Sequence, residues 1–493
     1  MRNPLLPIAL AAALLGGCAT VTNPVTGQRE LTVMDERSEI EAGRKAHEEV
    51  LKEYRVYDNP RLQAYVNTLG QTLARGSQRS QLDWHFTVLD STEVNAFALP
   101  GGYVYVTRGL MAYLEDEAEL AGVIGHEIGH VTARHGAQRA TRQQTAGIGV
   151  IAATILGAVL EARGASGATD LASTLSQGVA AGYIASYSRE QESQADQLGA
   201  EYLASSNYDP KSMIEVIGVL KSQEQFAADA ARAAGRPAPA GGGWLASHPS
   251  NDKRLQDIAQ YATRFKGKYG DDGRARYLQV MDGVTFGDSR EDGVVRGQNF
   301  YHEPLGIALT APAGWSLRNA SDALYLTNAA GDAGLIVYVA PAKAGATPEE
   351  IVRNLKLEQG RSERLTLGGL PAIHFAGTAR DQQGRSQAVE ATVVAGPGGR
   401  NFMLFYGARD AQALQRARAG MREAEATFRP LTAADRAAAR PWVLKTAPFP
   451  RGGFAELARR SPLGAGAEAQ LRLLNGAYPR GEPAVGQPVK IVE

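Results

Sequence analysis

Two histidines four residues apart constrain this chain more than any other feature. His126 and His130 enclose Glu127 in a His-Glu-Ile-Gly-His run with apolar and small residues on both sides. Positions i and i+4 of an α-helix lie on one face, so both imidazoles can reach a single ion if this run is helical. Glu127 then lies where its carboxylate can hold a metal-bound water and accept its proton. The run predicts a buried helix carrying two zinc ligands and a general base; the alternative is a chance match in an ordinary amphipathic helix.

A hydrolytic zinc site needs a third protein ligand and keeps a fourth position open for water or substrate. One known pattern places a glycine three residues and a histidine six residues after the second histidine. This chain has Ala133 and Gly136 at those positions, and His135 is one residue out of register. The short-range pattern therefore fails, and the third ligand has to come from elsewhere in the chain.

The acid-rich run at 188–201 is the strongest source of that ligand. It favours a helix, and Glu192 and Asp196 are spaced i, i+4, so that one face presents both carboxylates. Glu192 can bind the ion while Asp196 orients one of the ligating histidines. The alternative is a solvated acidic face.

These residues resemble the zinc metallopeptidases of the CAAX prenyl protease and HtpX type, and most closely their periplasmic BepA-like lipoproteins. That family pairs the histidine motif with a downstream Glu-x-x-x-Asp, matched here at 192–196. It also has an Asn-Ala-Phe segment, a Pro-Gly-Gly turn and a strand, matched at 95–110, and a Ser-His-Pro-Ser segment, matched at 247–250. The four landmarks occur in the family's order and cover roughly residues 20–265, about half the chain.

The resemblance implies roles for particular residues. His126, His130 and Glu192 would bind one Zn²⁺ per chain, and Glu127 would be the general base. The strand that follows the Pro-Gly-Gly turn at 100–102 would form the edge of the cleft and pair with an extended polypeptide substrate.

Two further residues are candidates for catalytic roles. In BepA-like relatives the histidine that matches His248 can approach the zinc and close the site; the alternative is a loop histidine with a satisfied hydrogen bond. His248 or Asn95 could also stabilise the oxyanion that forms during hydrolysis.

The amino terminus predicts where the chain works. Arg2 precedes an apolar run from Leu5 to Leu15, a length typical of a secretory signal rather than a membrane span. Leu-Gly-Gly-Cys at 15–18 resembles a bacterial lipoprotein cleavage box that ends at the only cysteine, Cys18. We therefore expect a chain anchored to the membrane through lipidated Cys18, on the periplasmic side of the outer membrane; the alternative is an ordinary signal peptide with an incidental cysteine.

Charge and composition limit the partners. Lysine plus arginine equals aspartate plus glutamate at 52 each, which gives no indication of nucleic-acid binding. With 44% hydrophobic residues the chain can bury substantial cores. The uncharged apolar run at 145–160 is short for a bilayer span, so it predicts either a buried helix or a segment that contacts a membrane or a partner.

The whole chain is predicted to be α+β. We expect a signal peptide (1–18), a tether (19–35) and a mainly helical, gluzincin-type peptidase domain with a small edge-strand sheet (36–285). An α+β accessory domain (286–432) and a weakly LysM-like tail (433–493) would follow. The tail could bind peptidoglycan, or simply contact protein.

The expected function is a zinc endopeptidase that hydrolyses misfolded or stalled envelope proteins. The alternative is a proteolytically silent or tightly gated envelope chaperone or cell-wall-binding adaptor. The intact Glu127 favours the enzyme, because a pure binding protein would not need a general base.

Overall fold

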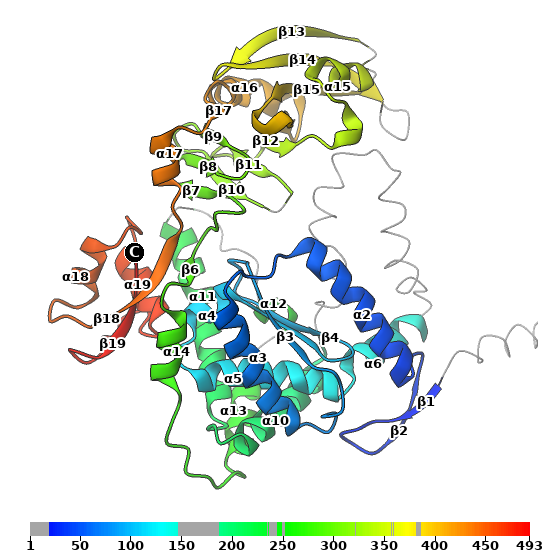
Figure 1. Ribbon diagram of the computed structural model, residues 1–493, viewed down its shortest axis with the longest axis vertical. Coiled ribbons are helices and arrows are strands. Elements are labelled where there is room, and N and C mark those ends of the chain that lie inside the picture. Colours follow the sequence, from blue (N-terminus) through cyan, green and yellow to red (C-terminus); the bar gives the residue numbers. More distant parts are fainter. Residues whose placement is uncertain are drawn as a thin grey trace, which may run out of the picture. The chain divides into compact units, whose positions relative to one another are not determined.

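The computed structural model describes residues 19–145, 187–233, 235, 244–248, 252–320, 322–355, 357, 359–380 and 386–493. The chain forms two compact units (Figure 1). The first contains the described residues up to Phe286 together with Val443–Glu493, and the second contains Gly287–Trp442. The mixture of helices with several sheets confirms the α+β class.

Helices dominate the part of the first unit that precedes Phe286. They are α2 (Glu36–Glu53), α3 (Pro60–Arg75), α4 (Arg108–Tyr113), α5 (Glu117–Thr132), α6 (His135–Thr145), α10 (Arg189–Ser205), α11 (Ser212–Ala233), α12 (Trp244–Ser247), α13 (Asp252–Ala262) and α14 (Arg274–Met281).

The helix α5 lies at the centre of this unit, and every residue from Glu117 to Thr132 is buried. Its first turn is capped by the Asp116 side chain, which accepts a hydrogen bond from the Glu119 amide. The neighbouring helix α10 approaches α5 closely because small residues line the contact. A Cβ added at Gly129 would lie 2.9 Å from the Ala195 carbonyl oxygen. The two histidines of α5 and the acids Glu192 and Asp196 of α10 are therefore carried by helices in direct backbone contact.

A small sheet packs against these helices in the order β3-β5-β4, with β3 at His85–Leu89, β4 at Ala96–Leu99 and β5 at Tyr103–Thr107. The strand β5 pairs in parallel with β3 and antiparallel with β4. The prediction that residues 103–107 form an edge strand is therefore wrong: β5 is the central strand. Pairing on both sides satisfies its backbone, so β4 and β3 provide the two edges of this sheet.

Residues 19–35, predicted as a tether, include a hairpin that is docked on the first unit. The strand β1 (Ala19–Thr22) pairs with β2 (Arg29–Thr32). After β2, the Val33 amide donates to the Thr141 hydroxyl of α6 at 3.1 Å, and Arg134 Nη2 donates to the Met34 carbonyl at 2.8 Å.

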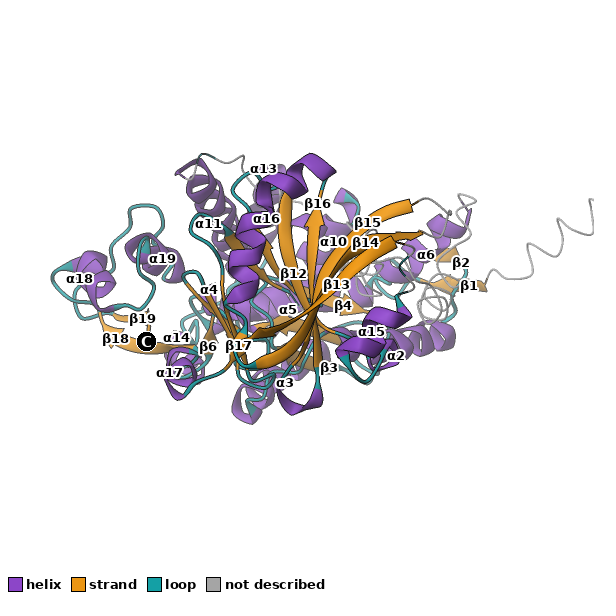
Figure 2. Ribbon diagram, turned by 90° about the horizontal axis from the view of Figure 1, so that it is seen from above, coloured by secondary structure: helices purple, strands orange, loops and turns teal. Residues whose placement is uncertain are grey.

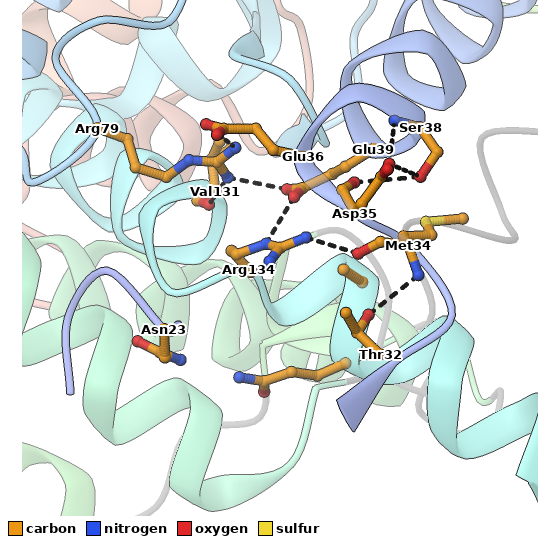
Figure 3. A network of polar contacts seen from close by, with 12 residues as sticks. Asn23, Thr32, Met34, Asp35, Glu36, Ser38, Glu39, Arg79, Val131 and Arg134 are labelled. Atoms are coloured by element: carbon orange, nitrogen blue, oxygen red, sulfur yellow. Dashed lines mark hydrogen bonds and ion pairs between the residues drawn. The ribbon is translucent and has the colours of Figure 1, made fainter. Parts of the chain in front are cut away.

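Buried ion pairs connect α2, which follows the hairpin, to the end of α5. Figure 3 shows Arg79 and Arg134 converging on Glu39 of α2, with distances of 2.9 and 2.6 Å to its two oxygens. Arg79 Nη1 also donates to the Val131 carbonyl, in the last turn of α5, at 3.0 Å. All three charged side chains are at most 5% exposed, so removing one would leave an unpaired buried charge.

The second unit is built on a seven-stranded antiparallel sheet in the order β10-β11-β12-β16-β15-β14-β13. Its strands are β10 (Ser316–Asn319), β11 (Leu324–Thr327), β12 (Ala333–Val339), β13 (Gln359–Leu367), β14 (Leu370–Arg380), β15 (Ser386–Ala395) and β16 (Asn401–Ala408).

Helices cover both faces of that sheet (Figure 2). Leu404 and Tyr406 of β16 share a core with α16 (Ala411–Ala426), whereas Met403 shares one with Ile351 of α15 (Pro348–Asn354). Alternate residues of one strand point to opposite faces, so α16 and α15 lie on opposite sides. A smaller sheet in the order β17-β9-β8-β7 completes the unit. Its strands are β17 (Arg429–Pro430), β9 (Ile307–Thr310), β8 (Asn299–His302) and β7 (Val294–Arg296). The unit also contains two 3₁₀ turns (Ala342–Ala344, Pro397–Gly399) and the short helix α17 (Ala433–Ala438).

The carboxyl-terminal residues from Val443 belong to the first unit. They run β18 (Trp442–Pro448), α18 (Gly453–Arg460), α19 (Ala467–Leu474) and β19 (Pro488–Val492), and β18 also pairs with β6 (Thr285–Phe286). The buried Lys490 ammonium donates to the Ala112 and Leu114 carbonyls at the end of α4, at 2.9 and 2.6 Å. The tail therefore packs on the peptidase unit, while its LysM-like character remains a prediction.

Two sequence features fall largely or wholly outside the described residues: Cys18, and the run 145–160 apart from Thr145. In the part of the chain that is described, none of the helices combines the length and the apolar character that crossing a membrane requires.

Candidate metal centre

Two helices and one residue that follows a third helix bring four potential metal ligands together. His126 and His130 come from α5, Glu192 from α10, and His248 follows α12 directly. One donor atom from each lies within 4.8 Å of all the others, and all four residues are buried. The structure thus assembles the three residues predicted as ligands and places His248 beside them.

The donor atoms point toward a common centre. His126 Nε2 lies 3.0 Å from His130 Nε2, and these two nitrogens lie 3.5 and 3.4 Å from Oε2 and Oε1 of Glu192 respectively. His248 Nδ1 lies 3.1 Å from His126 Nε2 and 3.0 Å from Glu192 Oε1. Imidazole nitrogens and a carboxylate are the ligands that Zn²⁺ prefers, so the chemistry of this donor set fits zinc.

Asp196 lies behind His126, with its Oδ1 2.9 Å from His126 Nδ1. The Arg254 guanidinium of α13 pairs with both acids of α10, at 2.7 Å to Asp196 and 2.8 Å to Glu192. Burial by itself would raise the pKa of Asp196, but Arg254 and the hydrogen bond with His126 hold that pKa below its usual value. Asp196 is therefore held ionised and can fix the ring orientation of His126.

Glu127 has one carboxylate oxygen engaged and one without a partner. Its Oε1 accepts a hydrogen bond from the Trp244 indole at 3.0 Å and lies 3.5 Å from His248 Nε2. Its Oε2 is buried and has no hydrogen-bond partner among the described residues. A buried carboxylate oxygen left in this way is costly unless it meets water, metal or substrate, so this atom also fits a hydrolytic metal site.

His248 is held by aromatic contacts as well as by the acids. Its ring stacks on Trp244 with centroids 4.4 Å apart and an interplanar angle of 18°. The Trp244 amide in turn donates to the Val94 carbonyl at 2.9 Å, which fastens α12 next to the start of β4.

Asn95 lies apart from this arrangement. Its amide and carbonyl bond to Thr107, and its buried Oδ1 has no partner in the described part of the chain. No described contact joins Asn95 to the four-residue cluster.

Three residues around the site have no role assigned from the sequence, although Arg254 follows the Ser-His-Pro-Ser landmark at 247–250. Trp244 and Arg254 lie far from the histidine motif along the chain, and only the fold brings them to it. His135 was considered as a ligand and excluded by its register, yet it contacts His130 at 2.9 Å. The signal for a role of His135 other than ligation was its proximity to the motif.

Comparison with known proteins supports this reading of the geometry. Residues 60–262 match the model of Peptidase family M48. Over this segment the chain is similar to the M48 metallopeptidases. The matched segment contains α5, α10, α12 and α13 and all four residues of the metal centre.

Curated relatives agree with the family match. The beta-barrel assembly-enhancing protease of Yersinia pestis is 30% identical over 258 residues, covering 48% of this chain and 50% of that protein. The protein of the same name from Escherichia coli K12 is 32% identical over 211 residues, covering 42% of this chain and 40% of that one. The mitochondrial metalloendopeptidase OMA1 of Arabidopsis thaliana is 31% identical, covering 42% and 38%. The chain thus spans half or less of the length of these relatives.

Solved structures add little. LpqN of Mycobacterium tuberculosis, involved in cell envelope biogenesis, is 17% identical, covers 26% of this chain and 83% of that one, and has a TM-score of 0.20. A likeness at that level carries no argument about fold or function.

Proposed function

We propose that this protein is a zinc-dependent endopeptidase that hydrolyses peptide bonds of misfolded or stalled envelope proteins. The observation that carries the proposal is the convergence of His126, His130 and Glu192 beside a buried carboxylate oxygen of Glu127 that has no partner among the described residues. A scaffold protein would gain nothing from that costly arrangement.

His126, His130 and Glu192 would hold the zinc ion, which when bound supplies Lewis acidity and lowers the pKa of water to about 7. Glu127 Oε2 would accept a proton from the attacking water and return it to the departing amine. The Trp244 indole fixes the other oxygen of Glu127, so that the carboxylate keeps one orientation during the transfer.

His248 and Asn95 are the proposed oxyanion donors, and their positions differ. His248 lies within the ligand cluster, where its imidazole could donate to a developing negative charge. The buried Asn95 side chain lies just before β4 and would have to reach the reacting carbonyl of a bound substrate.

An extended polypeptide is the proposed substrate, and β4 rather than β5 is the strand that could pair with it. One side of β4 is paired with β5, and no other described strand pairs with its second side, which is where we propose strand addition. The names of the relatives from Yersinia pestis and Escherichia coli associate those proteins with β-barrel assembly, which supports envelope proteins as the substrate class. We place the chain on the periplasmic side of the outer membrane, anchored through lipidated Cys18, with peptidoglycan as a candidate ligand of the tail.

A gated form of the same enzyme is the second candidate. His248 Nδ1 lies 3.0 Å from Glu192, within the ligand set, and the Trp244 amide is bonded at the approach to β4. In this arrangement α12 and His248 together restrict access to the site. Purified protein would then cleave test substrates weakly until a client displaced them.

Zinc content and casein cleavage, measured together, test the proposal. We expect one zinc per chain in the wild type, zinc without cleavage in Glu127→Gln, and loss of zinc in Glu192→Ala. Glu201→Ala, also on α10, is the matched control and should keep both properties. Faster cleavage by His248→Ala would support the gated form. A wild type that stays zinc-free and inactive after zinc is added would refute the endopeptidase.

A further inference from the structure

His135 lies directly behind one of the proposed zinc ligands. It is the first residue of α6, it is fully buried, and it follows Arg134, whose φ of 59° turns the chain sharply at the end of α5. Its Nδ1 lies 2.9 Å from His130 Nδ1, and its Nε2 lies 2.9 Å from Gln194 Oε1 of α10. A continuous chain of hydrogen bonds thus runs from His130 through His135 to Gln194.

The two ring nitrogens of His130 face different partners, and this places His135 outside the ligand set. His130 Nε2 contacts His126 Nε2 and Glu192, whereas His130 Nδ1, on the other side of the same ring, contacts His135. His135 therefore cannot share the ion with His130, although it is the nearest histidine outside the motif along the chain. What it can do is control the ring of the ligand.

The order of donors and acceptors settles which nitrogen of each ring carries hydrogen. A carboxamide oxygen only accepts, so His135 Nε2 must donate to Gln194 Oε1. If the His135 ring carries one hydrogen, its Nδ1 is then an acceptor and His130 Nδ1 is the donor to it. His130 Nε2 is left with a free lone pair, which is the atom that faces Glu192 and the other donors.

We propose that His135, held by Gln194, is a positioning residue that fixes the tautomer and the ring orientation of His130 for metal binding. This inference rests on the proposed zinc site and gives it a second residue, besides Asp196, that orients a ligating histidine. His126 has a carboxylate behind it, Asp196, while His130 has a neutral imidazole. Because Gln194 lies on α10 between Glu192 and Asp196, this single helix orients both histidines and supplies the third ligand.

The stacking of Tyr187 on His130 supports the same role. Its ring lies 3.8 Å from that of His130 at an interplanar angle of 22°, so one face of the imidazole is covered. Stacking restrains the ring against tilting but leaves it free to flip, and a flip would exchange Nδ1 and Nε2. The hydrogen bond to His135 is the contact that distinguishes the two nitrogens.

Zinc affinity, measured by competition with a chelator, tests the proposal without relying on catalysis. His135→Phe keeps a planar ring that cannot accept a hydrogen bond. Gln194→Ala removes the side chain to which His135 donates. We expect each to weaken zinc binding about 10–100-fold, the range typical of outer-shell partners. His135→Gln, which can still offer an acceptor, should recover part of the loss. Gln197→Ala, at an exposed position of the same helix, is the matched control and should bind zinc as the wild type does.

Two more measurements separate positioning from a merely structural role. The thermal midpoint of the zinc-free protein should be nearly the same for Gln194→Ala and the wild type. Nitrogen-15 spectra of the histidine rings, of which there are only eight, should show hydrogen on Nδ1 of His130 and on Nε2 of His135. Wild-type zinc affinity in both His135→Phe and Gln194→Ala would overturn the proposal, as would hydrogen on His130 Nε2 in the zinc-loaded protein. A wild type that binds zinc but cleaves nothing would refute the endopeptidase and leave the role of His135 intact.

Discussion

Replacing Gly129 by alanine should separate the two helices that carry the metal ligands. The added Cβ would lie 2.9 Å from the Ala195 carbonyl oxygen, 3.1 Å from Ala195 Cα and 3.3 Å from Leu198 Cβ. Since an ordinary carbon–oxygen contact needs about 3.4 Å, α10 has to move by roughly 0.5 Å relative to α5. Both contacts at Ala195 are to backbone, so a side-chain rotation cannot relieve them.

The free energy of unfolding should fall by a modest amount. Overpacking of a core costs about 1–3 kcal/mol, and replacing a helical glycine by alanine returns about 1 kcal/mol. The expected net loss is about 0–2 kcal/mol, or a fall of up to ~8 °C in the melting temperature of a domain of this size. Zinc binding should suffer more, because Glu192 lies one turn before Ala195 and ligand distances tolerate only about 0.2 Å.

The matched control is Gly218→Ala on α11, where a Cβ would meet nothing within 4 Å. That variant should gain about 0.5–1 kcal/mol from the lower entropy of its unfolded chain and keep wild-type zinc affinity. Melting curves and chelator competition on the two variants give the comparison. The reasoning fails if Gly129→Ala is as stable as Gly218→Ala and binds zinc equally well.

Three other predictions follow from charges and metal. Arg254→Met should destabilise the zinc-free protein by about 3–5 kcal/mol, because it leaves two buried carboxylates without their cation. Zinc should recover part of that loss in melting experiments, and equal losses with and without zinc would contradict this prediction. Burial and the Asp116 charge raise the pKa of Glu119 to about 8. The folded state therefore binds more protons than the unfolded one, and the resulting stability is present below the unfolded pKa and lost as the pH rises through about 8. Glu119→Gln should accordingly raise the melting temperature at pH 9 but not at pH 4, and an equal change at both would count against the burial argument. Chelation of zinc should lower the melting temperature of the wild type but not that of Glu192→Ala, and a similar shift in both would place the stabilising ion elsewhere.

The local parts of this fold could be predicted because their signals are local. The i, i+4 histidines and the Asp116 cap mark α5, and the acids of α10 carry their own spacing. The M48 family resemblance is confirmed by the match over residues 60–262.

The order of the strands could not be predicted, because it depends on pairings between distant residues. Along the chain β4 precedes β5, and nothing in Tyr-Val-Tyr-Val reveals that β3 pairs with its other side. The strands β13 and β14 were also missed, since their glycines and charged residues weaken the alternation that marks a strand.

The surroundings of the metal centre were harder to predict than its ligands. A ligand is revealed by its chemical type and spacing, whereas a residue behind a ligand is revealed only by contact. Trp244 is 117 residues from Glu127 along the chain, and Arg254 is 58 residues from Asp196. His135 shows the limit from the other direction: the register correctly argued against ligation but said nothing of what the residue does instead.

The docked hairpin of residues 19–35 has a practical consequence for work on this protein. A shortened protein that begins at Glu36 would treat the preceding residues as a dispensable tether. It would lose the Met34 carbonyl, which accepts a hydrogen bond from Arg134, and the end of β2, where Thr32 and Val33 contact Thr141. Such a truncation would loosen the turn between α5 and α6, which lies five residues or fewer from His130 (Figure 3). Poor activity of the shortened protein could then be mistaken for evidence that the enzyme needs a membrane. A version that begins at Ala19 lacks Cys18, the proposed lipidation site, and keeps these contacts.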